Sequence, residues 1–142
     1  MGLTNEPNVI TSTTRPAAYD QLRDGFSHLS GVTAIVLLSS DGIARCGYGL
    51  PVEEVQTLAA ACSGLASLGR GVAGTDGGDL VHVNVTLERR QVIITGCGEG
   101  SVLVVCLTRE APLGVAMAET LRLAKAFGRQ MGTAERADLA AR

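Results

Sequence analysis

Apolar residues recur along the chain at the spacing of a helix in three segments. Leu22, Phe26 and Leu29 predict a first helix, which begins after Thr14 with Pro16 in its first turn. A second helix is predicted from Pro51 to about Val72, and a third from about Leu113 to Met131. The apolar positions of the second helix are Val55, Leu58, Cys62, Leu65 and Val72.

Five other segments have the composition or the alternation of strands. Val81, Val83, Val85 and Leu87 alternate with polar residues, which predicts a strand with one apolar face. These alternating residues belong to the predicted strand Leu80–Leu87. The other predicted strands are Val32–Ser39, Ile43–Gly49, Arg90–Cys97 and Ser101–Leu107. The order α-β-β-α-β-β-β-α, with its runs of hairpins, predicts an α+β fold around a mostly antiparallel sheet.

Length and composition indicate one globular domain. The chain has 142 residues, of which 46% are hydrophobic, and we expect a domain over residues 16–131 between a flexible leader (1–15) and a flexible tail (132–142). A net charge of −2 and 3% aromatic residues argue against nucleic-acid binding. The leader lacks the apolar core of a signal peptide, and no apolar run reaches the length of a membrane span. We therefore expect a cytoplasmic protein without membrane insertion.

Residues able to do chemistry are few. The four cysteines form no Cys-x-x-Cys pair and lie in apolar stretches, which favours buried thiols over metal or redox sites. Gly69–Gly74 matches the letters of a dinucleotide-binding motif, but it closes a predicted helix instead of opening one. There is no phosphate-binding loop or Gly-x-Ser-x-Gly motif, and His28 and His82 lie near no nucleophile. We expect no enzymatic activity, no cofactor and no metal.

Two neighbouring segments favour association with a second copy of the chain. Leu80–Leu87 has the pattern of an edge strand without the Pro or Lys that would protect it, and the preceding helix is rich in Ala, Ser and Gly. We predict a symmetric homodimer in which these strands pair and the helices pack alongside. The predicted interface residues are Val55, Leu58, Ala59, Cys62, Leu65, Val81, His82, Val83, Asn84 and Val85.

The ordered set of segments resembles a known family. The run from Gly31 to Ile43, the small-residue helix after Pro51, the segment Gly98–Val105 and Pro112-Leu113-Gly114 before the last helix resemble the roadblock / dynein light chain family. The likeness covers about residues 17–131. It is greatest to the bacterial branch, which in actinobacteria is typically encoded beside a small Ras-like GTPase and a sensor-kinase-like protein.

The resemblance implies a five-stranded antiparallel sheet, with the first and last helices on one face and the middle helix on the other. It also implies a non-enzymatic regulator in a signalling pathway, whose dimer docks a small Ras-like GTPase on the face where the middle helices pair. The GTPase-facing residues would be Glu53, Gln56, Ala60, Ser63, Ser67 and Arg70. The alternative is a small-molecule sensor of profilin-like or PAS-like architecture, which would need a concave pocket with convergent polar groups.

Overall fold

The computed structural model describes residues 8–9, 17–98 and 100–140. Within these ranges the chain forms three helices and six strands, of which the first strand has only two residues. The elements are β1 (Asn8–Val9), α1 (Ala17–Phe26), β2 (Val32–Ser39), β3 (Ala44–Tyr48), α2 (Val52–Gly71), β4 (Val83–Thr86), β5 (Arg90–Gly96), β6 (Ser101–Thr108) and α3 (Leu113–Ala140).

The strands form one antiparallel sheet with the order β1-β3-β2-β6-β5-β4. The two strands that are apolar on both faces, β2 and β6, lie next to each other in its middle, where each face is covered. The alternating strand β4 lies at one border, as its pattern predicts. The predicted α+β fold, with five main strands in an antiparallel sheet, is confirmed.

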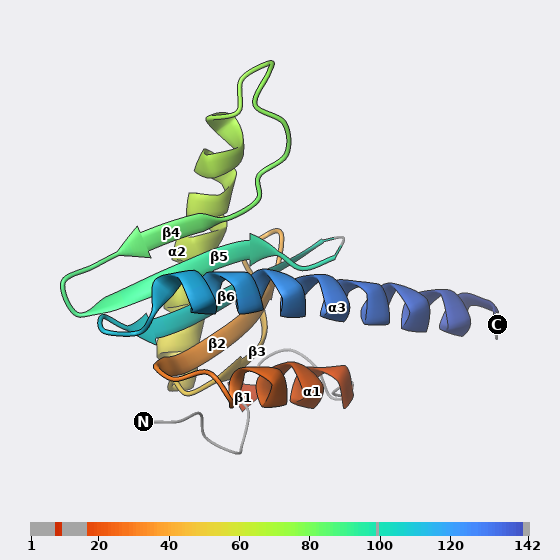
Figure 1. The fold of residues 1–142 in the computed structure, drawn as a ribbon. Helices are drawn as coiled ribbons and strands as arrows, with labels where there is room; N and C mark the ends of the chain where they lie inside the picture. Colours follow the sequence, from red (N-terminus) through yellow and green to blue (C-terminus); the bar gives the residue numbers. More distant parts are fainter. Residues whose placement is uncertain (1–7, 10–16, 99, 141–142) are drawn as a thin grey trace.

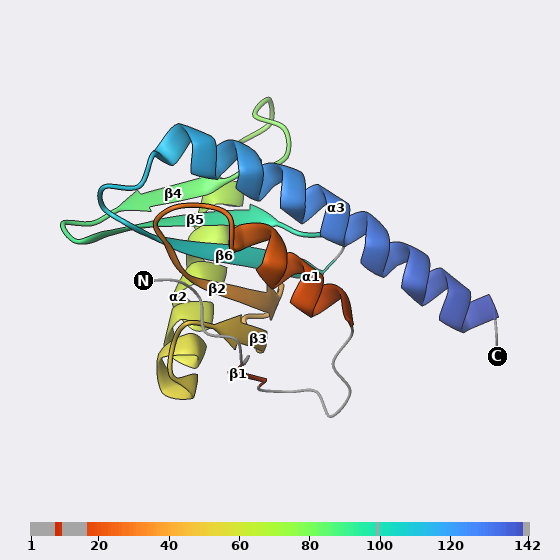
Figure 2. The same cartoon turned by 60° about the horizontal axis from the view of Figure 1, so that its bottom comes forward.

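Helices cover both faces of the sheet (Figure 1). Phe26 of α1 and Phe127 of α3 are buried in one core with Ile35 of β2. Val55 and Ala59 of α2 are buried in a second core on the opposite face. Figure 2 shows α1 and α3 on one side of the strands and α2 on the other, which is the arrangement that the resemblance implies.

Two ends differ from the expected boundaries. The last helix continues to Ala140, so most of the segment expected to be a flexible tail is helical. Residues 133–140 are rich in Ala, Glu, Arg and Leu, which have high helix propensity, and no Pro interrupts them. In the expected leader, Asn8 and Val9 form β1, and the rest of that segment lies outside the described residues.

A buried amide fixes the connection between β6 and α3. The side chain of Gln91 is 3% exposed, and its Nε2 donates to the carbonyl oxygens of Thr108 (3.3 Å), Arg109 (3.2 Å) and Ala111 (3.4 Å). The carbonyl of Thr108 also accepts from the N–H of Ala111 at 3.3 Å, and the carbonyls of Arg109 and Ala111 belong to the loop between β6 and α3. Gln91 therefore holds the start of α3 against β5.

Replacing this amide is expected to cost stability. Gln91→Leu keeps a similar volume but removes the side-chain donor to the part-buried carbonyl of Arg109 and the buried carbonyl of Ala111, so the free energy of unfolding should fall by about 1–3 kcal/mol. Urea unfolding followed by circular dichroism measures the change. Gln56→Leu, at an exposed position of α2, is the control and should change it by less than about 0.5 kcal/mol. Equal stability of the two variants would contradict the role given to Gln91.

Candidate interaction surface at β4 and α2

The hydrogen bonds of the β4–β5 hairpin determine which way the backbone groups of β4 point. The N–H of Leu87 donates to the carbonyl of Arg90 at 2.8 Å, which makes these two residues a hydrogen-bonded pair. The strands continue from there without a register shift through the four pairs between Val83 and Thr86. Hydrogen-bonded and non-hydrogen-bonded pairs alternate along an antiparallel ladder. Val85 and Val83 therefore direct their N–H and C=O groups toward β5.

The alternate residues of β4 direct theirs the other way. Asn84 and Thr86 present their backbone N–H and C=O groups outward from the border of the sheet, and the sheet order places no strand beyond β4 among the described residues. Such a row of donors and acceptors is a template for another strand. The predicted open edge is thus present at β4, with two outward-facing residues in the strand.

Two contacts fix β4 in place against the rest of the chain. Thr95 Oγ1 donates to the carbonyl of Val81 at 2.8 Å, which holds the segment before the strand. On the α2 side, a Cβ added to Gly69 would lie 3.0 Å from Cγ2 of Val83 and 3.2 Å from Cδ1 of Leu80. The absence of a side chain at Gly69 therefore lets α2 cross closely over the start of β4.

The inner face of α2 is committed to the core. Val55, Ala59 and Cys62 are at most 1% exposed, and with Ala66 they pack on the sheet. All three were predicted at the dimer interface, and the structure instead places them inside their own chain. Their i, i+4 and i+7 spacing marks one buried face, but it does not say whether the sheet or a second chain covers that face.

One flank of α2 carries apolar residues that are progressively less covered toward its C-terminal end. Leu58 and Leu65 are half-buried beside the side chains of β4. Leu68 is 71% exposed and Val72, just after the helix, is 86% exposed. In Figure 1 this end of α2 projects past β4, beyond the border of the sheet. Val72, which the sequence pattern places on the apolar stripe of the helix, thus has no cover within the described chain.

A groove of about 380 Å³ runs along the same flank of α2, beside its N-terminal half. Its lining is formed by Leu50, Glu53, Glu54, Thr57, Leu58, Ala61 and Arg90. Of these residues, only Glu53 and Leu58 are among the interface and docking residues predicted from the sequence. The recurrence of Glu54, Leu58, Ala61 and Leu65 at steps of three and four could have indicated one flank, but the approach of Arg90 from β5 required the fold.

The predicted GTPase-facing residues lie on the solvent side and the opposite flank of α2. Glu53, Gln56, Ala60, Ser67 and Arg70 are exposed and follow one another at helical spacing. Ser63 differs, because it is half-buried and its hydroxyl donates to the carbonyl of Ser40 at 3.3 Å, in the β2–β3 turn. The structure therefore brings five of the six predicted residues together on an open surface.

The predicted interface residues of the β4 segment divide between its two faces. Val83 and Val85 are half-buried toward α2, whereas Val81, His82 and Asn84 are exposed. Val81, at 64% exposed, adds an apolar side chain next to the open edge.

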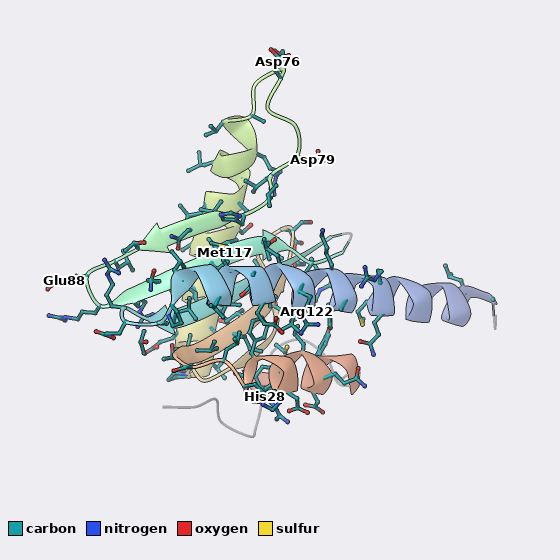
Figure 3. All side chains as sticks on the ribbon, viewed as in Figure 1. His28, Asp76, Asp79, Glu88, Met117 and Arg122 are labelled. Atoms are coloured by element: carbon teal, nitrogen blue, oxygen red, sulfur yellow. The ribbon has the colours of Figure 1, made fainter. Side chains whose placement is uncertain are left out.

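Buried cysteines and scattered acidic and histidine side chains are the further candidates for chemistry in the described part of the chain. Burial raises the pKa of Cys62 and of Cys97 to about 12 and that of Cys106 to about 11, so these thiols are protonated at neutral pH. Within the described ranges no three His, Cys, Asp or Glu side chains are grouped to hold a metal ion. Figure 3 shows Asp76 and Asp79 on the loop between α2 and β4, Glu88 at the β4–β5 turn and His28 after α1, each pointing outward.

None of the helices, over the residues the structure describes, has an apolar stretch long enough to cross a membrane.

Comparison with known proteins finds solved structures with a similar fold. A Roadblock/LC7 domain from Streptomyces avermitilis is 34% identical and superposes with a TM-score of 0.72, over 79% of this chain and 96% of that one. The gliding protein MglB from Thermus thermophilus has 20% identity and a TM-score of 0.71, over 86% and 93%. MglB from Myxococcus xanthus has 17% identity and a TM-score of 0.68, over 82% and 94%. Comparison with curated proteins by sequence gives no significant match.

The two MglB likenesses show a shared fold. The Roadblock/LC7 domain family matches residues 19–107, which run from within α1 to the penultimate residue of the central strand β6. Together with the 34% identity to the Streptomyces domain, this match shows that the chain belongs to the Roadblock/LC7 family.

Proposed function

We propose that the chain is a non-enzymatic regulatory module of a cytoplasmic signalling pathway, in which a homodimer docks a small Ras-like GTPase. The observation that carries the proposal is the open edge of β4, with the outward N–H and C=O groups of Asn84 and Thr86. It lies directly beside the projecting, apolar end of α2. A sensor-kinase-like protein of the same pathway is a further proposed partner.

A two-fold axis through the middle of β4 would join the sheets of two copies. Antiparallel pairing of two β4 strands gives every outward group of Asn84 and Thr86 a partner, and it uses the same surface on both copies. The assembly then closes at two subunits, because each copy has used its β4 edge.

This pairing also determines which flank of α2 meets the partner. Since α2 crosses the start of β4, near Val83, the axis passes on the side of the helix that carries Leu58 and Leu65. The partner's α2 would lie along that flank. Leu68 and Val72 would leave solvent and reach toward the partner's groove beside its Leu58 and Ala61.

Small residues on α2 would let the two helices approach closely. Ala61 lies in the groove, and a Cβ added to Gly64 would meet no atom of its own chain within 4 Å. Glycine inside a helix costs about 1 kcal/mol relative to alanine, so its presence at an open position is consistent with a neighbour that needs the room.

The surface that remains open on the paired helices would be the docking site. It carries Glu53, Gln56, Ala60, Ser67 and Arg70, a mixture of charged, polar and small residues typical of a partner that binds and leaves. The resemblance to the roadblock / dynein light chain family implies docking of a small GTPase on the face where these helices pair, which supports the same use here.

A pull-down from the native cytoplasm tests this proposal, run once with GDP and once with a non-hydrolysable GTP analogue. The wild-type chain should recover a small GTPase, identified by mass spectrometry, preferentially in one nucleotide state. Ala60→Arg, which places a long charged side chain on the docking surface, should lose it. Ala118→Arg, at a position of α3 on the other face of the sheet, is the matched control and should retain it.

Failure to recover a GTPase with either nucleotide, from a folded and dimeric protein, would contradict the docking proposal. The groove beside α2 would then support the second candidate, a small-molecule sensor, because its 380 Å³ and its convergent Glu53, Glu54 and Arg90 suit a small ligand. A ligand that copurifies with the protein would favour that candidate.

A further inference from the structure

The sheet has a second border, opposite β4, and a short segment of the same chain covers it. On its inner side β3 pairs with β2, and on its outer side it pairs with β1 through Asn8↔Gly47 and Val9↔Cys46. Figures 1 and 2 both show β1 beside β3, at the far side of the sheet from β4. The two borders therefore differ, because β4 is open and β3 is capped.

Without β1, the middle of β3 would be a second template for pairing. The side chains of Cys46 and Tyr48 are at most 1% exposed, and Gly47 faces Val55 of α2, so this part of β3 is firmly held within the fold. Its sequence, Ala-Arg-Cys-Gly-Tyr, has no Pro or Lys, and Arg45 is its one charged residue. These are features of an edge that accepts another strand.

Two open borders would change the kind of assembly that the chain forms. Pairing through β4 alone closes at two copies, because the symmetric contact leaves no second β4 edge. A copy with a free β3 edge as well could pair at both borders, and sheets joined in this way have no natural limit.

We propose that the edge of β3 is a second strand-pairing surface, and that β1 occupies it within the same chain so that the sheet grows only through β4. This inference rests on the proposed β4 dimer. With only two residue pairs, β1 supplies few hydrogen bonds against the entropy of ordering it. The cap is therefore weak, and two substitutions suffice to remove it.

The test uses the full chain with Asn8→Pro and Val9→Pro, which remove both backbone N–H groups of β1. Asn8→Ala and Val9→Ala, which keep both N–H groups, form the matched control. Light scattering over a concentration series should give the dimer mass for the control. The proline variant should give species of at least twice the dimer mass, whose share grows with concentration. Identical masses for the two proteins would overturn the proposal.

The same variants, made in a chain whose β4 edge is blocked, separate this inference from the proposed dimer. With Asn84→Pro added to block β4, the alanine control should be monomeric and the proline variant should dimerise through β3. A wild-type chain that is already a monomer would show that the proposed β4 dimer is wrong. In that case, the proposal that β1 covers a pairing surface on β3 still requires the proline variant to associate.

Hydrogen exchange gives a readout that does not depend on association. Protection of the backbone amide of Gly47, which faces β1, should fall in the proline variant relative to the alanine control, while the protection of Cys46, whose amide faces β2, and the circular dichroism stay the same. Unchanged protection of the Gly47 amide would show that β1 does not cover β3, and would overturn the proposal.

Discussion

Asn84→Pro is expected to turn the dimer into a monomer while the fold stays intact. The N–H of Asn84 faces away from β5, so proline removes a backbone hydrogen bond to the second copy and no backbone hydrogen bond within the chain. The exposed side-chain bond from Asn84 Nδ2 to Thr86 Oγ1 is lost equally in an alanine variant. The interface contains this position twice. Two lost hydrogen bonds at about 1 kcal/mol each raise the dissociation constant roughly 30-fold, and the carbonyls left unpaired raise it further.

Light scattering at decreasing concentration measures the change, and urea unfolding verifies that the monomer remains folded. Asn84→Ala is the control, because it removes the side chain but keeps the N–H, and it should dimerise much as the wild type does. A proline variant that stays dimeric down to the dilution at which the wild type dissociates would exclude β4 from the interface.

Leu68→Glu should weaken the dimer by a comparable amount through the helices. In a single chain Leu68 is 71% exposed, so a charge there should change the free energy of unfolding of the monomer by less than about 0.5 kcal/mol. In the dimer the same side chain would lie against the partner's α2. Losing the burial of one leucine, worth about 1.5–3 kcal/mol, on each of two subunits predicts a dissociation constant raised at least about 100-fold.

Val115→Glu provides the comparison for that variant. Val115 is 60% exposed on α3, at the other face of the sheet, so the substitution makes the same chemical change outside the proposed interface. Sedimentation equilibrium should give the wild-type dissociation constant for Val115→Glu. If both glutamate variants dimerise equally well, the projecting end of α2 takes no part in the assembly.

The sequence predicts the sheet well because its strands differ in how many of their faces are apolar. β2 and β6 are apolar on both faces, which is possible only where helices cover both sides of a strand. The alternation around Val83 and Val85 instead needs one solvated face, and this placed β4 at the border.

The faces of α2 are harder to predict, because two different surfaces bury apolar residues on one helix. Cys62 and Leu65 both belong to its apolar pattern, yet Cys62 is in the core and Leu65 is on the flank beside β4. Helical periodicity gives the angle of a residue around the helix axis and leaves open what lies there. The approach of Arg90 to this flank depends on the β4–β5 turn, which the helix sequence does not encode.

The pairing of β1 with β3 was not predicted for a related reason. Two residues, Asn8 and Val9, are too few to show alternation. Their position depends on the edge of β3 with which they pair, and not on their own composition. The length of α3 is a different case, since residues 133–140 have the composition of a helix although they were interpreted as a tail.

Hydrogen exchange at β4, measured at high and at low protein concentration, tests the central claim most directly. The backbone amides of Asn84 and Thr86 face solvent in a single chain, whereas those of Val83 and Val85 are bonded to β5. We expect Asn84 and Thr86 to be protected at concentrations where the dimer forms and to lose that protection on dilution, while Val83 and Val85 stay protected throughout. Rapid exchange of Asn84 and Thr86 at every concentration would contradict the account, because no second strand would then cover this edge.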